Sequence, residues 1–202
     1  MSRLLETIKI ADGQICNIAY HNRRLNRSRV AHYTVADTID IRDHIDIPLD
    51  KRNGVYKCRV LYQSDIQQVE YHEYQIRTIN SLQLVKANII EYSHKYEDRS
   101  ALLDLFQLKG EVDDILIIKR GLVTDSYYCN VALRTSDDQW ITPTAPLLRG
   151  TKRQQLLDEG ILSTGDISRD DLDDYSAICL FNSMIEFGEI ELPIAAINTN
   201  LP

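Results

Sequence analysis

The first half of the chain alternates apolar and polar residues with a period of two, a pattern that predicts β-strands. Two such segments, Leu4–Ala11 and Gln14–Ala19, flank Asp12-Gly13, a dipeptide that favours a tight hairpin turn. Further strands are predicted at Val55–Tyr62, Gln68–Ile76 and Leu82–Val85. This half of the chain is therefore expected to form a meander of strands.

Three segments instead repeat their apolar residues at helical spacing. The first, His21–His32, carries Leu25 and Val30 on its apolar side. The second, Asp98–Leu108, begins at a residue suited to cap a helix, and the third, Thr151–Glu159, opens with the residues of a capping box. The two later helices belong to a part of the chain with its own pattern.

That second part carries strands of its own, predicted at Asp114–Lys119, Tyr127–Arg134, Gln139–Thr142, Ala177–Phe181 and Ile190–Ala196. The change of pattern near residue 90 predicts two domains: a small N-terminal α+β domain over residues 1–90 and a larger strand-rich domain over residues 91–202. The expected fold class is mixed α/β (α+β).

Composition and charge argue against several classes of function. The 202 residues include 23 Lys and Arg against 30 Asp and Glu, a net charge of −7, which argues against a general binder of nucleic acid. No apolar run has the length of a signal peptide core or a membrane helix, so a cytoplasmic protein is expected. The four cysteines are widely spaced and the five histidines lack metal-ligand spacing, so neither disulfides nor a metal site is expected.

A helix start in the second domain is suited to receive an anion. The segment from Pro143 to Arg153 ends a strand, turns at Gly150 and opens the third helix. The backbone N–H groups of the first helical turn and the positive end of the helix dipole would face one point there. When this segment is taken alone, an ordinary capped surface helix is the favoured interpretation, because helix caps are far commoner than ligand sites.

Two further residues, Lys95 and Asp125, are candidate reactive groups if their side chains are buried. Lys95 stands at the predicted domain junction, where desolvation would favour the neutral amine that forms Schiff bases. Asp125 stands at the entrance of a strand, where a carboxylate beside a cofactor ring nitrogen would hold that nitrogen protonated. The plainer alternatives are a solvated lysine and a turn aspartate.

These features occur in an order that resembles the class IV aminotransferases, the fold-type IV pyridoxal phosphate (PLP) enzymes. That family includes branched-chain and D-amino-acid aminotransferases and 4-amino-4-deoxychorismate lyase. The motifs are His21-x-x-Arg24-Leu25, Lys-x-x-Asp-Arg at residues 95–99, Gly-Leu-Val-Thr-Asp at residues 121–125 with Asn130 five residues later, and Thr142-Pro143 with Leu148, Gly150 and Arg153. The resemblance spans nearly the whole chain.

The resemblance implies a role for each matching residue. Lys95 corresponds to the lysine that forms the internal aldimine and moves the α-proton, and Asp125 to the acid that faces the pyridine nitrogen. The remaining cofactor-binding residues implied by the family all correspond to its phosphate-binding groups: Arg24, Gly150, Thr151, Lys152 and Ser183.

The chain departs from the family at two points. Asp125 stands where the family usually has glutamate, and the chain begins almost at the strand that in relatives follows an extra N-terminal segment. From strand alternation alone, Arg59 is a candidate partner for a substrate carboxylate, because it shares one face with Lys57. A solvated charge on an exposed strand face is the alternative.

The resemblance predicts a PLP-dependent class IV aminotransferase or 4-amino-4-deoxychorismate lyase-like enzyme that acts on an amino acid or a similar small molecule. It also predicts a homodimer. The alternative is a truncated, non-catalytic relative that binds PLP or another phosphorylated metabolite.

Overall fold

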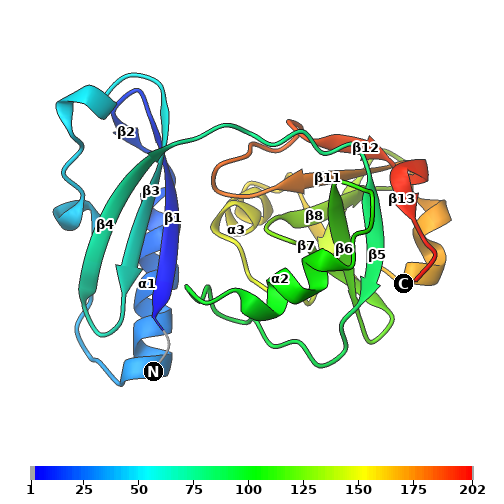
Figure 1. Ribbon diagram of the computed structural model, residues 1–202, viewed down its shortest axis with the longest axis horizontal. Helices are drawn as coiled ribbons and strands as arrows, with labels where there is room; N and C mark the ends of the chain where they lie inside the picture. The colour runs from blue at the N-terminus through cyan, green and yellow to red at the C-terminus, as the bar shows by residue number, and fades with distance from the viewer. Residues whose placement is uncertain (1–2, 202) are drawn as a thin grey trace. The chain divides into compact units, whose positions relative to one another are not determined.

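Two separate β-sheets organise the computed structural model, which describes residues 3–201 (Figure 1). The contacts between residues divide the chain into two units. Unit 1 comprises residues 1–76 together with residues 94–98, and unit 2 comprises residues 77–93 and 99–202. The predicted mixed α/β class is confirmed.

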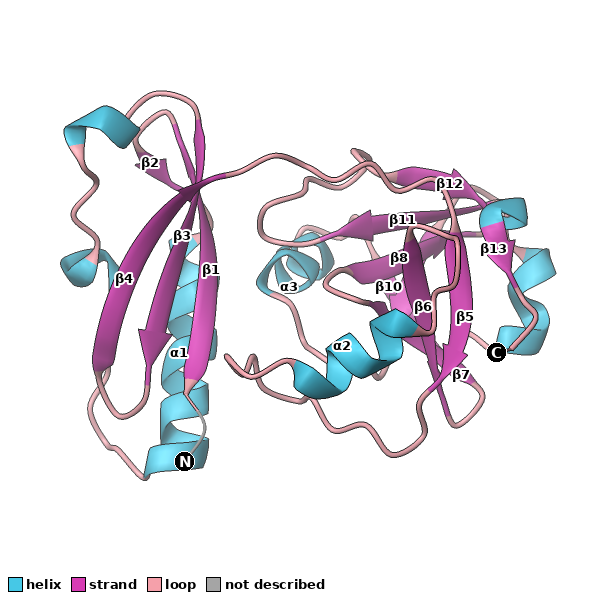
Figure 2. Ribbon diagram, in the orientation of Figure 1, coloured by secondary structure: helices cyan, strands magenta, loops and turns pink. Residues whose placement is uncertain are grey.

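Unit 1 is a four-stranded antiparallel sheet with one long helix, α1 (Ile18–Tyr33), against one face (Figure 2). The sheet order is β2-β1-β3-β4, with β1 at Leu4–Ala11, β2 at Gln14–Ile15, β3 at Val55–Tyr62 and β4 at Ile66–Glu73. Two short 3₁₀ helices, Ile41–His44 and Leu49–Lys51, lie between α1 and β3.

The core of unit 1 follows from strand alternation. Every second residue of β1 and β3 faces α1, so Ile8, Cys58 and Val60 are fully buried together with Leu25 of the helix. The bounds predicted for β1 and β3 are confirmed. Val30, however, is 58% exposed, so its assignment to the apolar side of the helix was wrong.

The boundary between β2 and α1 also differs from the prediction. The strand expected over Gln14–Ala19 ends at Ile15, because Asn17 adopts a left-handed conformation with φ of 54°. An extended strand cannot continue through such a residue, and the helix begins directly after it, at Ile18. The helix is therefore longer at both ends than the segment His21–His32.

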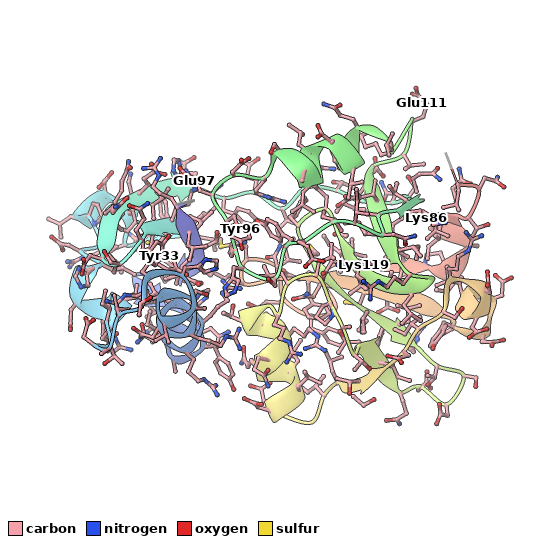
Figure 3. All side chains as sticks on the ribbon, turned by 90° about the horizontal axis from the view of Figure 1, so that it is seen from below. Tyr33, Lys86, Tyr96, Glu97, Glu111 and Lys119 are labelled. Atoms are coloured by element: carbon pink, nitrogen blue, oxygen red, sulfur yellow. The ribbon has the colours of Figure 1, made fainter. Side chains whose placement is uncertain are left out.

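Residues 94–98 join the free edge of β1, although the bonded residues Leu5 and Lys95 are 90 positions apart in sequence (95 − 5). The amide of Leu5 donates to the carbonyl of Lys95 at 2.9 Å, and the amide of Glu97 donates to the carbonyl of Arg3 at 2.9 Å. The side chains of Arg3 and Glu97 add an ion pair at 2.7 Å. These bonds fix the chain on both sides of Tyr96, which is labelled with Glu97 in Figure 3.

Unit 2 is built on a nine-stranded sheet. Its main path has the order β10-β9-β8-β7-β6-β5-β13, while β11 pairs with β8 and β12. The strands are β5 (Leu82–Lys86), β6 (Asp114–Lys119), β7 (Leu122–Ser126), β8 (Asn130–Arg134), β9 (Trp140–Pro143), β10 (Ser163–Gly165), β11 (Ala177–Phe181), β12 (Glu191–Pro193) and β13 (Ile197–Asn198). The helices are α2 (Ser100–Gln107), α3 (Thr151–Asp158) and the 3₁₀ turns Arg169–Asp174 and Ile194–Ala196.

Several expectations for unit 2 need correction. The strand expected over Ile190–Ala196 is only Glu191–Pro193, followed by a 3₁₀ turn, and the strand expected from Tyr127 begins at Asn130. The strand β5 pairs in parallel with β6, so it lies in unit 2 although the predicted first domain extended to residue 90. The strands β7 and β10 were not predicted. The capping box of the third helix is absent, because Gly150 is the N-cap and Gln154 bonds Asp158 through its side chain.

The four cysteines are all free thiols. Cys58, Cys129 and Cys179 are buried free thiols, and Cys16 is half-buried. Within residues 3–201, no helix combines the length and apolar character that crossing a bilayer requires.

Asp114, at the start of β6, is fully buried, and its Oδ2 atom has no hydrogen-bond partner among the described residues. Burial raises the pKa of Asp114 to about 6. The folded state therefore retains a proton that the unfolded state has lost, and stability falls as the pH rises from about 4 to about 6. Asp114→Asn is expected to raise the free energy of unfolding above pH 6 by on the order of 2 kcal/mol and to give no gain below pH 4.

Urea unfolding across this pH range measures the effect. Asp113→Asn serves as the control, because bonding to the amide of Asn80 lowers the pKa of Asp113. A gain of equal size at every pH would contradict the assignment to Asp114 ionisation.

Candidate active site

Unit 1 buries a charged cluster between β1 and α1. Glu6 interrupts the apolar positions of β1 that face the helix, and it is fully buried. Its Oε1 and Oε2 atoms accept hydrogen bonds from Nε and Nη2 of Arg24 at 2.8 and 2.5 Å. Nδ1 of His21 lies 2.6 Å from Oε2 of the same carboxylate. The spacing of His21 and Arg24 in the family motif thus places both side chains against one acid.

The ionisation of this cluster is set by its contacts. Burial alone would raise the pKa of Glu6, but the charge of Arg24 and the hydrogen bonds from His21 and Arg24 lower it to about 2. Burial lowers the pKa of His21 despite Glu6, and the charges of Arg24 and Lys95 act in the same direction as burial. At neutral pH Glu6 is an anion and His21 is neutral, so Nδ1 of His21 donates to Glu6.

Lys95 is held by its backbone on the edge of β1. Tyr96 packs against the core that α1 covers, and successive residues of an extended segment face opposite sides. Leu5, which lies opposite Lys95 in the ladder and next to the core residue Leu4 in β1, therefore faces the side of the sheet away from α1. The amine is near enough to the cluster for its charge to lower the pKa of His21.

Arg59 projects from β3 onto this same side of the sheet, because it pairs with Thr7 in register. The predicted division of β3 into two faces is confirmed, since Cys58 and Val60 are buried in the core. Nη1 of Arg59 donates to Oε2 of Glu70 on β4 at 2.6 Å. The strand is internal rather than at an edge, so Arg59 is half-buried and oriented by its acid partner.

Asp125 is buried in unit 2, at the end of a hairpin. It lies directly opposite Asn130 in the pairing of β7 with β8. Nδ2 of Asn130 donates to Oδ1 of Asp125 at 2.5 Å, and the amide of Leu148 donates to Oδ2 at 3.1 Å. Burial raises the pKa of Asp125 to about 7, although these donors and the charge of Arg153 oppose the shift.

The start of α3 lies beside this acid. Nδ2 of Asn130 also donates to the carbonyl of Leu148 at 2.8 Å, and a Cβ atom at Gly150 would overlap Oδ1 of Asn130. The first bond within the helix runs from the amide of Gln154 to the carbonyl of Gly150, so the amides of residues 151–153 face the helix start. Unit 2 thus brings Asp125, Gly150 and Thr151 into one region.

Lys152 links the helix to the turn after β11. Its Nζ forms an ion pair with Glu186, and the turn containing Ser183 is closed by Asn182, whose Oδ1 accepts from the amides of Met184 and Ile185 at 2.7 and 3.1 Å. The backbone of this turn is therefore fixed next to α3. Ser183, which the resemblance assigns to the phosphate, belongs to it.

Three residues of these regions were given no role by sequence reasoning. Glu6 carries a detectable signal, since it is a charge at an inward-facing position of an apolar strand. The sequence analysis named Asn130 and Arg153 only as members of the family motifs and assigned them no role. Arg153 is 4% exposed, and its Nε and Nη2 atoms donate to Oγ1 of Thr142 at 3.2 Å and to the carbonyl of Pro143 at 2.7 Å. It therefore ties β9 to α3.

No group of three or more His, Cys, Asp or Glu side chains in the described part of the chain is arranged to hold a metal ion. Unit 1 by itself holds the backbone of Lys95, and unit 2 by itself holds a buried acid beside a helix start, the kind of place where backbone amides can bind an anion.

Comparisons with known proteins give the family. The amino-transferase class IV family matches residues 93–192. An uncharacterised protein of Haemophilus influenzae is 37% identical over 186 residues, which cover 91% of this chain and 98% of that protein. The chain belongs to the class IV aminotransferase family. The predicted family is thus confirmed, and with it the prediction of an enzyme of this family.

Solved structures agree with this membership. A candidate 4-amino-4-deoxychorismate lyase from Haemophilus somnus has a TM-score of 0.85 and 34% identity, with 92% of this chain and 98% of that chain covered. A hypothetical aminotransferase from Mycobacterium tuberculosis, solved in a PLP-bound form, has a TM-score of 0.79 at 16% identity, with 98% and 82% covered. The fold is therefore that of the class IV enzymes. These family and structural matches do not favour the alternative of a non-catalytic relative.

Glu6→Gln is expected to destabilise this class IV protein by about 3–5 kcal/mol, because it leaves the buried guanidinium of Arg24 without its counter-charge. The same loss is expected in the native protein as the pH falls from about 4.5 towards 2 and Glu6 takes up a proton.

Denaturant unfolding at neutral pH measures the first effect. Glu97→Gln, which breaks the more exposed pair with Arg3, should cost no more than about 1 kcal/mol. Equal losses for the two variants would show that Glu6 is not the counter-ion of Arg24.

Proposed function

We propose that this class IV enzyme uses pyridoxal 5'-phosphate to act on the amino group of an amino acid or amino-acid-like molecule, either as an aminotransferase or as a 4-amino-4-deoxychorismate lyase. The observation that carries the proposal is the buried carboxylate of Asp125, held on both oxygens beside a helix start. A buried acid of raised pKa needs a cationic partner to ionise fully, and a protonated ring nitrogen is such a partner.

The residues fit the parts of PLP. The helix start at Gly150 suits a phosphate, because amides and the helix dipole face it and the acidic side chain of Glu186 is neutralised by Lys152. Lys95 suits the aldehyde, since its backbone is fixed on both sides. PLP has been seen bound in the Mycobacterium tuberculosis relative. When bound, this cofactor supplies an electron sink for the bond broken at the substrate α-carbon.

Each residue then has a distinct task in the reaction. Lys95 gives its neutral amine to hold the cofactor and afterwards takes the proton from the substrate α-carbon. Asp125 keeps a proton on the ring nitrogen by remaining anionic beside it. Arg24 and the backbone of Gly150, Thr151 and Lys152 hold the phosphate, together with the hydroxyl of Ser183.

Arg24 reaches a ligand only as part of its pair with Glu6. Because Glu6 engages Nε and Nη2, the guanidinium is fixed in one plane before any ligand arrives. We propose that this arrangement orients the guanidinium for binding a phosphate without reorganisation. We further propose a cytoplasmic protein with no nucleic-acid or membrane partner, which is consistent with four free cysteines and the net charge of −7. The family resemblance additionally leads us to propose a homodimer.

The experiment that tests the reaction uses reconstituted protein with 4-amino-4-deoxychorismate and with a panel of amino acids. Pyruvate released without any keto-acid acceptor identifies a lyase, which the Haemophilus somnus relative favours. Amino transfer that requires a keto acid identifies an aminotransferase. Cofactor binding without either turnover would instead support the non-catalytic alternative.

Lys95→Ala is expected to abolish the visible absorption that PLP acquires on condensing with a lysine. Borohydride reduction of the native protein should attach the cofactor to the peptide that contains Lys95, as mass spectrometry would detect. Lys109→Ala is the control, because the amine of Lys109 is engaged by the carbonyls of Gly110 and Val112. Attachment at another lysine, or unchanged absorption in Lys95→Ala, would refute the assignment.

Arg59→Gln is expected to raise the KM for a carboxylate substrate about 10- to 100-fold, because one charge-assisted contact contributes about 1.5–3 kcal/mol. The change in kcat should be smaller. Lys57→Gln alters a neighbouring charge on the same face and should raise KM less. A KM that is equally insensitive to both changes would leave Arg59 with only its structural pair to Glu70.

A further inference from the structure

We propose that Asn130 is a positioning residue whose single amide fixes both the acid Asp125 and the start of α3, and that Gly150 is glycine because Asn130 occupies the space of a side chain there. The inference rests on the proposed function for its meaning, because Asp125 and the helix start are the groups assigned to the two ends of the cofactor. The contacts themselves lie wholly within unit 2.

Both N–H groups of the Asn130 amide are engaged. One donates to Oδ1 of Asp125 at 2.5 Å and the other to the carbonyl of Leu148 at 2.8 Å. The amide of Leu148 returns a bond to Oδ2 of Asp125 at 3.1 Å. Asp125, Asn130 and Leu148 therefore form a closed ring of hydrogen bonds, and the amide plane of Asn130 cannot rotate without breaking two of them.

The carbonyl oxygen of this fixed amide points at Gly150, where it would overlap a Cβ atom. The backbone of Gly150 has φ of −66° and ψ of 149°, a conformation open to every residue type. Conformational freedom therefore does not explain the glycine. A flexible side chain could move aside for a methyl group, but Asn130 is held by Asp125 and Leu148, so space is what excludes a side chain at Gly150.

The consequence is mechanical coupling between two parts of the proposed site. The carbonyl of Gly150 accepts the first bond of α3, from the amide of Gln154 at 3.0 Å. A shift of Asn130 thus displaces the acid and the helix start together. A neutral amide suits this task, because it donates to the carboxylate and adds no charge to the buried region.

The first test is a double-mutant cycle on stability in the cofactor-free protein, with Asn130→Ala, Gly150→Ala and the double variant. Gly150→Ala is expected to reduce the folded-to-unfolded ratio about tenfold more in the native background than in the Asn130→Ala background. The control is Gly165→Ala, whose Cβ would meet Cγ2 of Ile141 at 2.7 Å, and whose effect should be independent of Asn130.

Equal costs of Gly150→Ala in both backgrounds would overturn the proposal. If Gly150→Ala fails to fold, folding of the double variant supports the proposal, and failure of the double variant contradicts it.

The second test separates positioning from mere packing. Asn130→Asp keeps the size of the side chain but replaces the donor with an acceptor facing Asp125. The midpoint of Asp125 titration, followed by carboxyl ¹³C NMR in the cofactor-free protein, is expected to rise by about one pH unit or more. Asn182→Asp, in the turn after β11, is the matched control and should leave the midpoint in place. An unchanged midpoint in Asn130→Asp would also overturn the proposal.

A third measurement connects the coupling to function. Asn130→Ala is expected to weaken PLP binding, measured by equilibrium dialysis, about tenfold, since the acid and the helix start lose their common support. If native protein binds no PLP, the proposed function fails while the two tests above remain decisive for Asn130. If native protein binds PLP and Asn130→Ala binds it equally well, the proposed coupling is refuted.

Discussion

Within each unit, the structure around a buried carboxylate depends on what replaces the hydration that the carboxylate has lost. Taking a carboxylate out of water costs several kcal/mol unless a full charge or several donors replace the lost hydration. Glu6 meets the full charge of Arg24 and stays ionised, with a pKa near 2. Asp125 is contacted by neutral donors, and burial raises its pKa to about 7. The acid of unit 1 is thus a permanent counter-ion, whereas the acid of unit 2 can respond to a cation that arrives beside it.

The same contrast explains the form of the motifs. His21 and Arg24 are separated by three positions because one helical turn must bring both to Glu6. Asp125 and Asn130 are separated by five positions because they face one another across a tight hairpin, in which the amide of Ser126 donates to the carbonyl of Cys129. Each spacing is therefore the local geometry of a helix or a hairpin, and this is why four short motifs were enough to predict the family.

Sequence reasoning succeeded where one local pattern decides the structure. The bounds of β1, β3, β6 and β11 follow from alternation or from a buried apolar run, and the structure reproduces them. It failed where a single backbone angle, or a partner far away in sequence, decides the structure. The left-handed Asn17 ends β2 early, and β10 exists only because three residues pair with β9. The edge position of residues 94–98 depends on bonds to Arg3 and Leu5, which no local pattern reveals.

The predicted site residues divide in the same way. The family motifs contain Lys95, Asp125 and Gly150, so the sequence was enough to find these residues. It was not enough to find the residues that hold them in place. Glu6 is 18 positions away from Arg24 in sequence. The role of Asn130 follows only from the structure, in which its amide donates to both Asp125 and Leu148. The shorter acid at position 125 is also intelligible from these supports. With one methylene fewer than glutamate, both of its oxygens reach donors from its own hairpin and from Leu148, and fewer rotamers must be frozen to hold them. Each oxygen still has a second lone pair, so a rigid short acid retains the capacity to accept a bond from a protonated ring.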